Sequence, residues 1–238
     1  MSTNKEPILQ NTFVAKPVYS ITPFTLLDYP DKTACILWFA GCNMRCEYCY
    51  NPDIVLGKGK FTFEETIRFL KSRKNLLDGV VLSGGECTLH KSIIPFIKEI
   101  KALNFLVKID TNGTNPEMLK YLLDENLIDY VALDFKAPCG KFQNITKSDL
   151  YKDFEKTLQL LVAGNCNFEV RTTIHSDLLN QSDIQEMVSC LEKNKYKGNY
   201  YLQNYINNTN TLGHLKNSGS NFVNIRKIET SIPVIGRN

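Results

Sequence analysis

The chain has 238 residues, of which 43% are hydrophobic and 22% are charged. This is the composition of an ordinary globular protein, and it excludes disordered, collagen-like and coiled-coil classes. The 28 Lys and Arg residues nearly balance 25 Asp and Glu residues and are spread along the chain, so we expect no nucleic-acid partner. The longest apolar stretch, residues 34–40, is far shorter than the roughly 18 residues that cross a bilayer, so we expect no membrane partner.

The cysteines are distributed unevenly along the chain. The first twenty residues lack the compact apolar region of a secretory signal, so we expect a cytoplasmic protein. Eight cysteines in that reducing compartment remain thiols. Three of them, Cys42, Cys46 and Cys49, lie within eight residues, whereas the other five are scattered singly. Metal binding or reactivity explains such a group better than disulfide formation does.

Six apolar, β-branched runs predict buried strands. In chain order they cover residues 33–39, 79–83, 105–110, 130–135, 168–173 and 200–205. The runs are almost entirely hydrophobic, which is typical of parallel strands that are connected and covered by helical crossovers.

Helical signals fall between these runs. Thr62 and Glu65 have the spacing of a capping box, and Ile93, Ile97 and Ile100 share one helical face. A further helix is predicted after a Ser148 cap, with one apolar face formed by Leu150, Phe154, Leu158 and Leu161. The pattern favours a single α/β domain over residues 1–238, with a core of about residues 19–205. Six such units form an open doubly wound sheet or an incomplete barrel, and periodicity does not decide between the two.

Ligands of both folds gather at the carboxyl ends of the strands, so the residues that follow each strand are the candidate site. After the first run, Cys42, Cys46 and Cys49 form a C-x3-C-x2-C motif on a loop, a spacing that lets three thiolates converge on one soft-metal centre. Structural zinc is the alternative, but it requires a fourth ligand, and the three histidines are remote in sequence. Three thiolates on a four-iron cluster leave one iron open for a small molecule.

The other five strands also end in polar or glycine residues. Taken alone, the Gly-Gly-Glu motif at residues 84–86 fits a tight turn. Asp110 or Asn112 likewise fits a turn before Gly113. Asp134 and Lys136 alternate with apolar residues and share one face, where a buried acid and base require a partner or ligand. The full set is Ser83, Gly84, Gly85 and Glu86, then Asp110, Thr111 and Asn112, then Asp134 and Lys136, then Arg171, and finally Gln203.

Together these motifs resemble the radical S-adenosylmethionine (SAM) superfamily, whose signature is C-x3-C-x2-C followed by Gly-Gly-Glu. From about residue 19 to its end, and most specifically between residues 26 and 52, the chain is similar to the activating enzymes of glycyl-radical proteins, and most similar to those of anaerobic ribonucleoside-triphosphate reductase. The resemblance implies an incomplete (β/α)6 barrel of parallel strands with the cluster loop after the first strand. It also implies a glycyl-radical enzyme as partner and a flavodoxin-like or ferredoxin-like electron donor.

The resemblance further implies a role for each matching position. Cys42, Cys46 and Cys49 would hold a [4Fe-4S] cluster whose open iron chelates SAM. Tyr48 would lie against adenine, and Tyr50 would also contact the cofactor. The methionine ammonium would meet the segment that consists of Ser83, Gly84, Gly85 and Glu86. The methionine carboxylate and a nearby cation would be surrounded by Asp110, Thr111, Asn112, Asp134 and Lys136, with Arg171 and Gln203 also facing the cofactor.

Three positions depart from the pattern of these relatives. Tyr50 stands where a histidine is frequent, Asp31 where a glycine is frequent, and Cys87 where a proline is frequent. Neither His175 nor His214 matches the histidine that some activating enzymes carry late in the chain. Three alternatives stay open: an activating enzyme of the pyruvate formate-lyase type, a small radical SAM enzyme that acts on a free base or nucleoside, and an iron-sulfur electron carrier.

Overall fold

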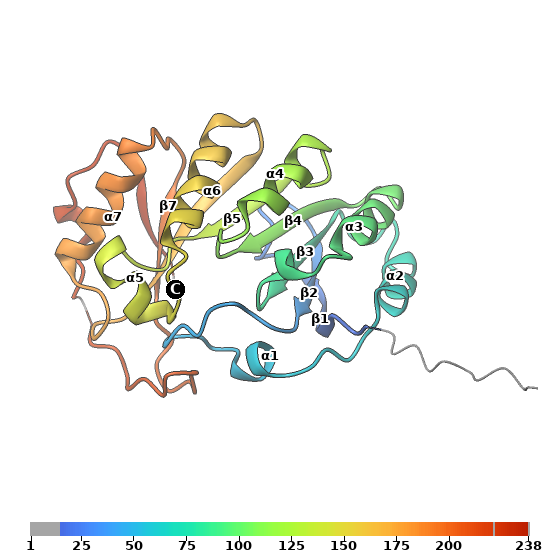
Figure 1. Ribbon diagram of the computed structural model, residues 1–238, viewed down its shortest axis with the longest axis horizontal. Helices are drawn as coiled ribbons and strands as arrows, with labels where there is room; N and C mark the ends of the chain where they lie inside the picture. The colour runs from blue at the N-terminus through green and yellow to red at the C-terminus, as the bar shows by residue number, and fades with distance from the viewer. Residues whose placement is uncertain (1–14, 221, 238) are drawn as a thin grey trace, which may run out of the picture.

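The computed structural model describes residues 15–220 and 222–237 (Figure 1). The expectation about an export signal therefore falls largely on residues 1–14, outside the described part of the chain. Within the described residues, no helix combines the length and apolar character that crossing a membrane requires.

One mixed sheet of eight strands forms the centre of the structure, and its spatial order is the order of the strands in the chain. β1 pairs antiparallel with β2, and every later neighbour pairs parallel. The strands are β1 (Val18–Thr25), β2 (Ala34–Phe39), β3 (Gly79–Gly84), β4 (Leu106–Thr111), β5 (Tyr130–Asp134), β6 (Asn167–Ile174), β7 (Tyr200–Asn204) and β8 (Val234–Arg237).

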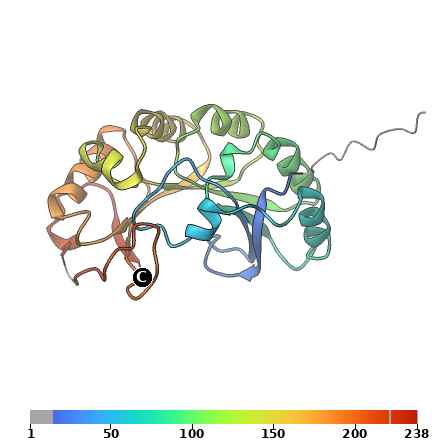
Figure 2. The same cartoon turned by 60° about the horizontal axis from the view of Figure 1, so that its bottom comes forward.

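The sequential strand order decides between the two predicted architectures. A doubly wound sheet reverses its winding at a switch point, whereas here every strand is added on the same side of its predecessor. Figure 2 shows the sheet as an arch with most of the helices on its convex side. β1 and β8 form the two edges, and no pairing joins them among the described residues. The predicted incomplete barrel is thus confirmed. Its six predicted parallel strands are β2 to β7, and β8 adds a seventh parallel strand at the edge.

Seven α-helices lie in the connections between strands. They are α1 (Pro52–Leu56), α2 (Phe63–Lys71), α3 (Ile93–Ala102), α4 (Pro116–Asp124), α5 (Cys139–Thr146), α6 (Tyr151–Ala163) and α7 (Gln181–Lys193). Short 3-10 turns occupy Cys87–Leu89 and Ile225–Lys227. The apolar helix faces pack on the sheet, and Ile93, Ile97 and Ile100 of α3 are fully buried, as their spacing predicts.

The capping prediction holds for α2 and fails for α6. At α2, the Thr62 hydroxyl accepts from the Glu65 amide at 3.0 Å, and the Glu65 carboxylate accepts from the Thr62 amide at 2.7 Å. Ser148 is not a cap, because α6 begins at Tyr151 after an N-cap at Leu150 that has no side-chain bond. The chain around Ser148 is still leaving α5, where Lys147 takes a left-handed conformation with φ of 56°.

All six predicted strands exist, and each of their ends agrees with the prediction to within one residue. The sequence reading missed the two edge strands, β1 and β8. Most of β1 is exposed or half-buried and contains Pro23, which only an edge strand tolerates. β8 has four residues and includes Gly236, so it carries almost no periodic signal.

The structure also explains the departure at Asp31. This residue lies between β1 and β2 with φ of 57°, the left-handed region that glycine adopts without strain. Aspartate tolerates that region better than most residues. The preference for glycine in relatives therefore has a backbone cause at this position.

The capping box gives a stability prediction. We expect Thr62→Ala to lower the free energy of unfolding by about 1 kcal/mol, because two amide groups at the start of α2 lose an acceptor or its alignment. Urea denaturation measures this change. Glu64→Ala in the same turn is the control, since its pairing with Arg68 is exposed and contributes little. Equal stability of the two variants would contradict the prediction.

Candidate active site

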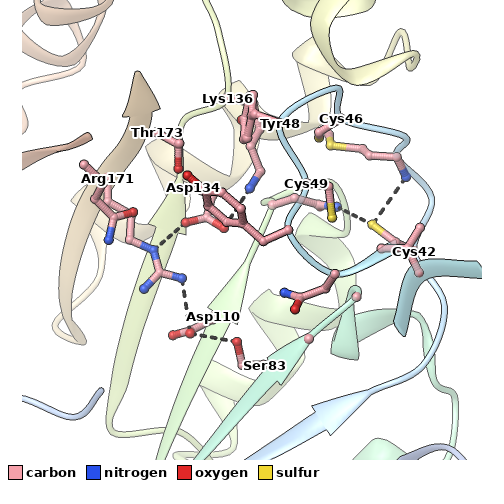
Figure 3. Close-up of a pocket in the computed structure, with 18 of the residues that line it drawn as sticks. Cys42, Cys46, Tyr48, Cys49, Ser83, Asp110, Asp134, Lys136, Arg171 and Thr173 are labelled. Carbon is pink, nitrogen blue, oxygen red and sulfur yellow. Dashed lines mark hydrogen bonds and ion pairs between the residues drawn. The ribbon is translucent and has the colours of Figure 1, made fainter. Parts of the chain in front are cut away.

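A cavity of about 350 Å³ opens at the carboxyl ends of the parallel strands. Figure 3 shows side chains from the loop after β2 on one side and from β3 to β6 on the other. Every predicted site residue except Glu86 lines this cavity. The predicted lining residues are Cys42, Cys46, Tyr48, Cys49, Tyr50, Ser83, Gly84, Gly85, Asp110, Thr111, Asn112, Asp134, Lys136, Arg171 and Gln203.

The three cysteines lie on residues 40–51, which we call the cluster loop. Its far side is anchored to the end of α5, where the Arg45 amide donates to the Thr146 carbonyl at 2.8 Å and the Glu47 amide donates to the Ile145 carbonyl at 3.1 Å. Backbone pairing thus fixes a segment that has no regular secondary structure of its own.

The glycines after β3 allow that strand to approach the cluster loop closely. A Cβ atom on Gly85 would lie 1.8 Å from the Gly41 carbonyl oxygen, which no side chain tolerates. Gly84 has φ of +113°, a conformation that glycine alone adopts readily. The Glu86 amide then donates to Gly41 oxygen at 2.9 Å and joins the two segments.

The thiols of the motif line the cavity. Burial raises the pKa of Cys46 to about 12, although the nearby Lys136 ammonium opposes this shift. Burial also raises the pKa of Cys42, whose sulfur accepts from the Met44 amide at 3.4 Å. A bound metal that replaces the thiol protons would remove this cost, so the donor set fits a metal centre better than free thiols.

The arrangement of the thiols bears on the kind of metal centre. Across residues 15–220 and 222–237, no three His, Cys, Asp or Glu side chains are arranged to hold a single ion. A four-iron cluster has a different requirement, because each thiolate binds its own iron atom. Three thiols that line one cavity from a single loop, as Cys42, Cys46 and Cys49 do, fit that requirement.

Glu86 corrects the expectation of a carboxylate open to a ligand. Its side chain is fully buried and accepts from the Thr88 hydroxyl at 2.6 Å, the Thr111 hydroxyl at 2.9 Å and the Asn112 amide at 2.7 Å. Burial raises its pKa, and these donors oppose the shift. Glu86 therefore holds the end of β4 against the turn after β3, while Ser83, Gly84 and Gly85 remain at the cavity wall.

A buried network of charges crosses β4, β5 and β6 (Figure 3). The Arg171 guanidinium lies 2.5 Å from an Asp134 oxygen and 3.1 Å from an Asp110 oxygen. Lys136 pairs with Asp134 at 2.9 Å, and Lys108 pairs with Asp110. One guanidinium thus occupies the position between two carboxylates from adjacent strands.

Neighbouring charges keep these groups ionised despite their burial. Burial alone would raise the pKa of Asp110, but the charges of Arg171 and Lys108 outweigh it and hold that pKa below the usual range. The pKa of Asp134 is lowered in the same way, since Arg171 and Lys136 outweigh burial. Burial would lower the pKa of Lys136, yet Asp134 raises it well above the usual value. The network presents fixed charges to the cavity rather than titrating ones.

Tyr48 is the residue of the cluster loop whose ring faces this network. Its ring faces the Lys136 ammonium at 5.8 Å, and its side chain is buried. Within the described residues, the Tyr48 hydroxyl has no hydrogen-bond partner. A buried hydroxyl at a cavity wall requires a partner, so this atom is consistent with a cavity that is completed by a ligand.

Several lining residues escaped the sequence reading. Thr173 and Asn204 follow predicted site residues by one or two positions near the ends of β6 and β7, so inspection of the whole strand end would have found them. Asp28 lies in the turn after the unpredicted β1, and Ile206 lies beyond β7. No local pattern marks these two positions.

The chain is similar to known proteins in sequence and in fold. The family model for the radical SAM superfamily matches residues 36–191. The structure is similar to that of SuiB of Streptococcus suis bound to S-adenosylmethionine, with a TM-score of 0.65 at 15% identity over 85% of this chain and 52% of that one. It is also similar to anSMEcpe with bound AdoMet, with a TM-score of 0.59 at 20% identity over 70% of this chain and 49% of that one.

The chain therefore belongs to the radical SAM superfamily, which uses a [4Fe-4S] cluster and SAM. Within it, the chain belongs with the glycyl-radical enzyme activating enzymes. It is 35% identical, over 74% of its length and 75% of the relative, to a putative glycyl-radical enzyme activating enzyme of Methanocaldococcus jannaschii. It is also 33% identical to the pyruvate formate-lyase-activating enzyme of Clostridium pasteurianum, in a match that covers 50% of this chain and 52% of the relative.

The cysteine motif gives a direct prediction. We expect Cys46→Ala to lose the cluster iron and reductive SAM cleavage, because two thiolates cannot retain a four-iron centre that three hold. Iron analysis and 5′-deoxyadenosine formation after anaerobic reconstitution measure both effects. Cys166→Ala is the matched control, since Cys166 lies outside the motif and beyond the cavity. Iron retention in the Cys46 variant would refute the assignment.

The charge network gives a second prediction. We expect Asp110→Asn to lower the free energy of unfolding at pH 7 by about 3 kcal/mol, because it leaves Arg171 and Lys108 short of a buried counter-charge. Urea denaturation tests this value. Asp124→Asn, which breaks an exposed pair with Lys120, should change stability by about 0.5 kcal/mol or less.

The same network sets a pH dependence. The pKa of Asp110 is lower in the folded state, so its contribution is fully present above the unfolded value of about 3.9 and is lost as pH falls below it. We therefore expect the stability difference between the wild type and Asp110→Asn to shrink as pH falls below about 4. A difference that stays constant down to acid pH would contradict this assignment of charge.

Proposed function

We propose that this protein is a radical SAM activating enzyme that abstracts hydrogen from a glycine of a partner, the anaerobic ribonucleoside-triphosphate reductase. The observation that carries the activating role is the 35% identity to a putative glycyl-radical enzyme activating enzyme across three quarters of both chains. The reductase as partner is supported by the resemblance of residues 26–52 to activating proteins of that enzyme.

The bound cluster and SAM supply a 5′-deoxyadenosyl radical, which takes a hydrogen atom from the substrate. In this proposal Cys42, Cys46 and Cys49 hold the cluster. Gly84 and Gly85 let the backbone approach the methionine end of SAM, and the charges of Lys136 and Arg171 attract its carboxylate. No side-chain acid or base is required, because the residues bind, orient and exclude water.

The cavity suits a backbone substrate. Glycine has no side chain, so a glycine-bearing loop can enter a narrow opening that admits few other residues. A flavodoxin-like or ferredoxin-like protein would deliver the electron, and the reaction would take place in the cytoplasm. We propose this electron donor and this location together with the activating role.

A second candidate is an activity on a nucleobase or nucleoside. It is favoured by 37% identity over 76 residues to the 7-carboxy-7-deazaguanine synthase of Rhodospirillum rubrum, which covers 32% of either chain. This match is shorter than those to the activating enzymes, so we rank it second. The activating enzyme of a pyruvate formate-lyase type protein remains the nearest alternative partner assignment.

The proposal predicts a spectroscopic product. Incubating the reduced protein with SAM and the anaerobic reductase should give a glycine-centred doublet in the electron paramagnetic resonance spectrum. Replacing the radical-bearing glycine of the reductase by alanine is the control and should abolish the doublet. A doublet only with a pyruvate formate-lyase type partner would change the partner. The absence of a signal with every glycyl-radical enzyme would favour the second candidate.

A further inference from the structure

The segment that follows β7 runs along the cluster loop, although 156 positions separate Tyr50 from Ile206 in the chain. We call residues 205–213 the strap. The Leu212 amide donates to the Cys49 carbonyl at 2.9 Å, and the Gly213 amide donates to the Glu47 carbonyl at 2.9 Å. Figures 1 and 2 both place the chain after β7 beside the loop after β2. The strap thus binds the side of the cluster loop that α5 leaves free.

The contact between the two backbones is close. A Cβ atom on Gly213 would lie 2.7 Å from the Cα atom and 2.8 Å from the carbonyl oxygen of Glu47. These are backbone atoms, which cannot turn away as the end of a flexible side chain can. Any residue larger than glycine at position 213 must therefore push the strap away from the loop.

Tyr50 provides the side-chain part of this attachment. Its hydroxyl oxygen accepts from the Ile206 amide at 2.8 Å, and its ring stacks on Tyr205 with centroids 5.4 Å apart. The Tyr205 ring in turn packs edge-to-face with the His175 ring, with centroids 4.6 Å apart. The Tyr205 backbone amide donates to the Ile174 carbonyl at 3.1 Å. One tyrosine therefore connects the cluster loop to the strap and, through Tyr205, to the end of β6.

The attachment forms part of the cavity wall. Asn204 and Ile206, on either side of Tyr205, both line the cavity, as does Tyr50 itself. Tyr50 also directly follows Cys49 in the chain. A shift of the strap would therefore move the β7 side of the cavity relative to the cluster loop.

We propose that Tyr50 is a positioning residue, which fastens the strap across the cluster loop and so sets how closely the cavity surrounds SAM. This rests on the assignment of the cavity to SAM and is independent of the identity of the glycyl-radical partner. It gives a role to the position at which relatives frequently carry histidine, because an imidazole nitrogen can accept the same amide proton. Phenylalanine would keep the stacking and lose the acceptor.

The first test uses SAM cleavage without any partner protein. Removing one hydrogen bond of ordinary strength predicts a KM for SAM that is about 3- to 10-fold higher in Tyr50→Phe, with the larger share of the loss in KM rather than kcat. Tyr50→His should recover part of this loss. Tyr121→Phe on α4, an exposed tyrosine remote from the cavity lining, is the matched control and should match the wild type. Equal KM values for Tyr50→Phe and Tyr121→Phe would overturn the proposal.

The second test needs no cluster and no activity. Hydrogen exchange of the protein before reconstitution should show several-fold faster exchange at the amides of residues 212 and 213 in Gly213→Ala. Gly140→Ala is the matched control, because a Cβ atom there has no neighbour within 4 Å. Unchanged exchange in Gly213→Ala would show that the strap does not hold the loop and would overturn the proposal. The same measurement on Tyr50→Phe before reconstitution should show faster exchange at the amide of Ile206, so the role of Tyr50 can be tested even if this variant fails to retain iron.

Because both tests omit the partner, they separate this inference from the proposed function. If the Tyr50 and Gly213 variants show the effects predicted above but no partner acquires a glycyl radical, only the partner assignment is refuted. Failure of both tests, together with a glycyl radical in the wild type, would refute only the role of the strap.

Discussion

The position of Arg171 between Asp110 and Asp134 is the interaction on which the candidate site depends. It joins β4, β5 and β6 at their carboxyl ends, with Lys108 and Lys136 completing the balance of charge. Removing these groups from water is costly, and each is stabilised mainly by the charges of the others. The charged end of the sheet is therefore fixed before any ligand arrives, and three cations against two carboxylates leave it attractive to an anionic group.

Close backbone contacts complete the site on its other side. Gly85 allows β3 to meet the cluster loop, and Gly213 allows the strap to meet it from the opposite direction. Between these contacts the cluster loop needs no secondary structure of its own, because neighbouring segments satisfy its amide and carbonyl groups. A loop held in this way can present three thiols to one cavity while it remains irregular.

Much of the fold could be predicted because its signals are local. Six continuous apolar runs and the capping box at Thr62 report on residues only a few positions apart, and the structure confirms them. The edge strands and the start of α6 were missed or misplaced. β1 is half exposed and β8 is very short. Ser148 directly follows Lys147, whose left-handed conformation at the end of α5 no capping pattern encodes.

The sequence by itself determined the spacing of Cys42, Cys46 and Cys49 and the presence of polar residues after each strand. These residues could be expected to gather in one site because parallel strands place their carboxyl ends along one edge. Only the tertiary structure decided how those residues are used. The inward orientation of Glu86 and the contact of Tyr50 with Ile206 depend on groups 25 and 156 positions apart, and the winding of the sheet depends on the pairing of whole strands. Such contacts leave no periodic trace in the chain, since they are set by how strands and loops pack rather than by neighbouring residues.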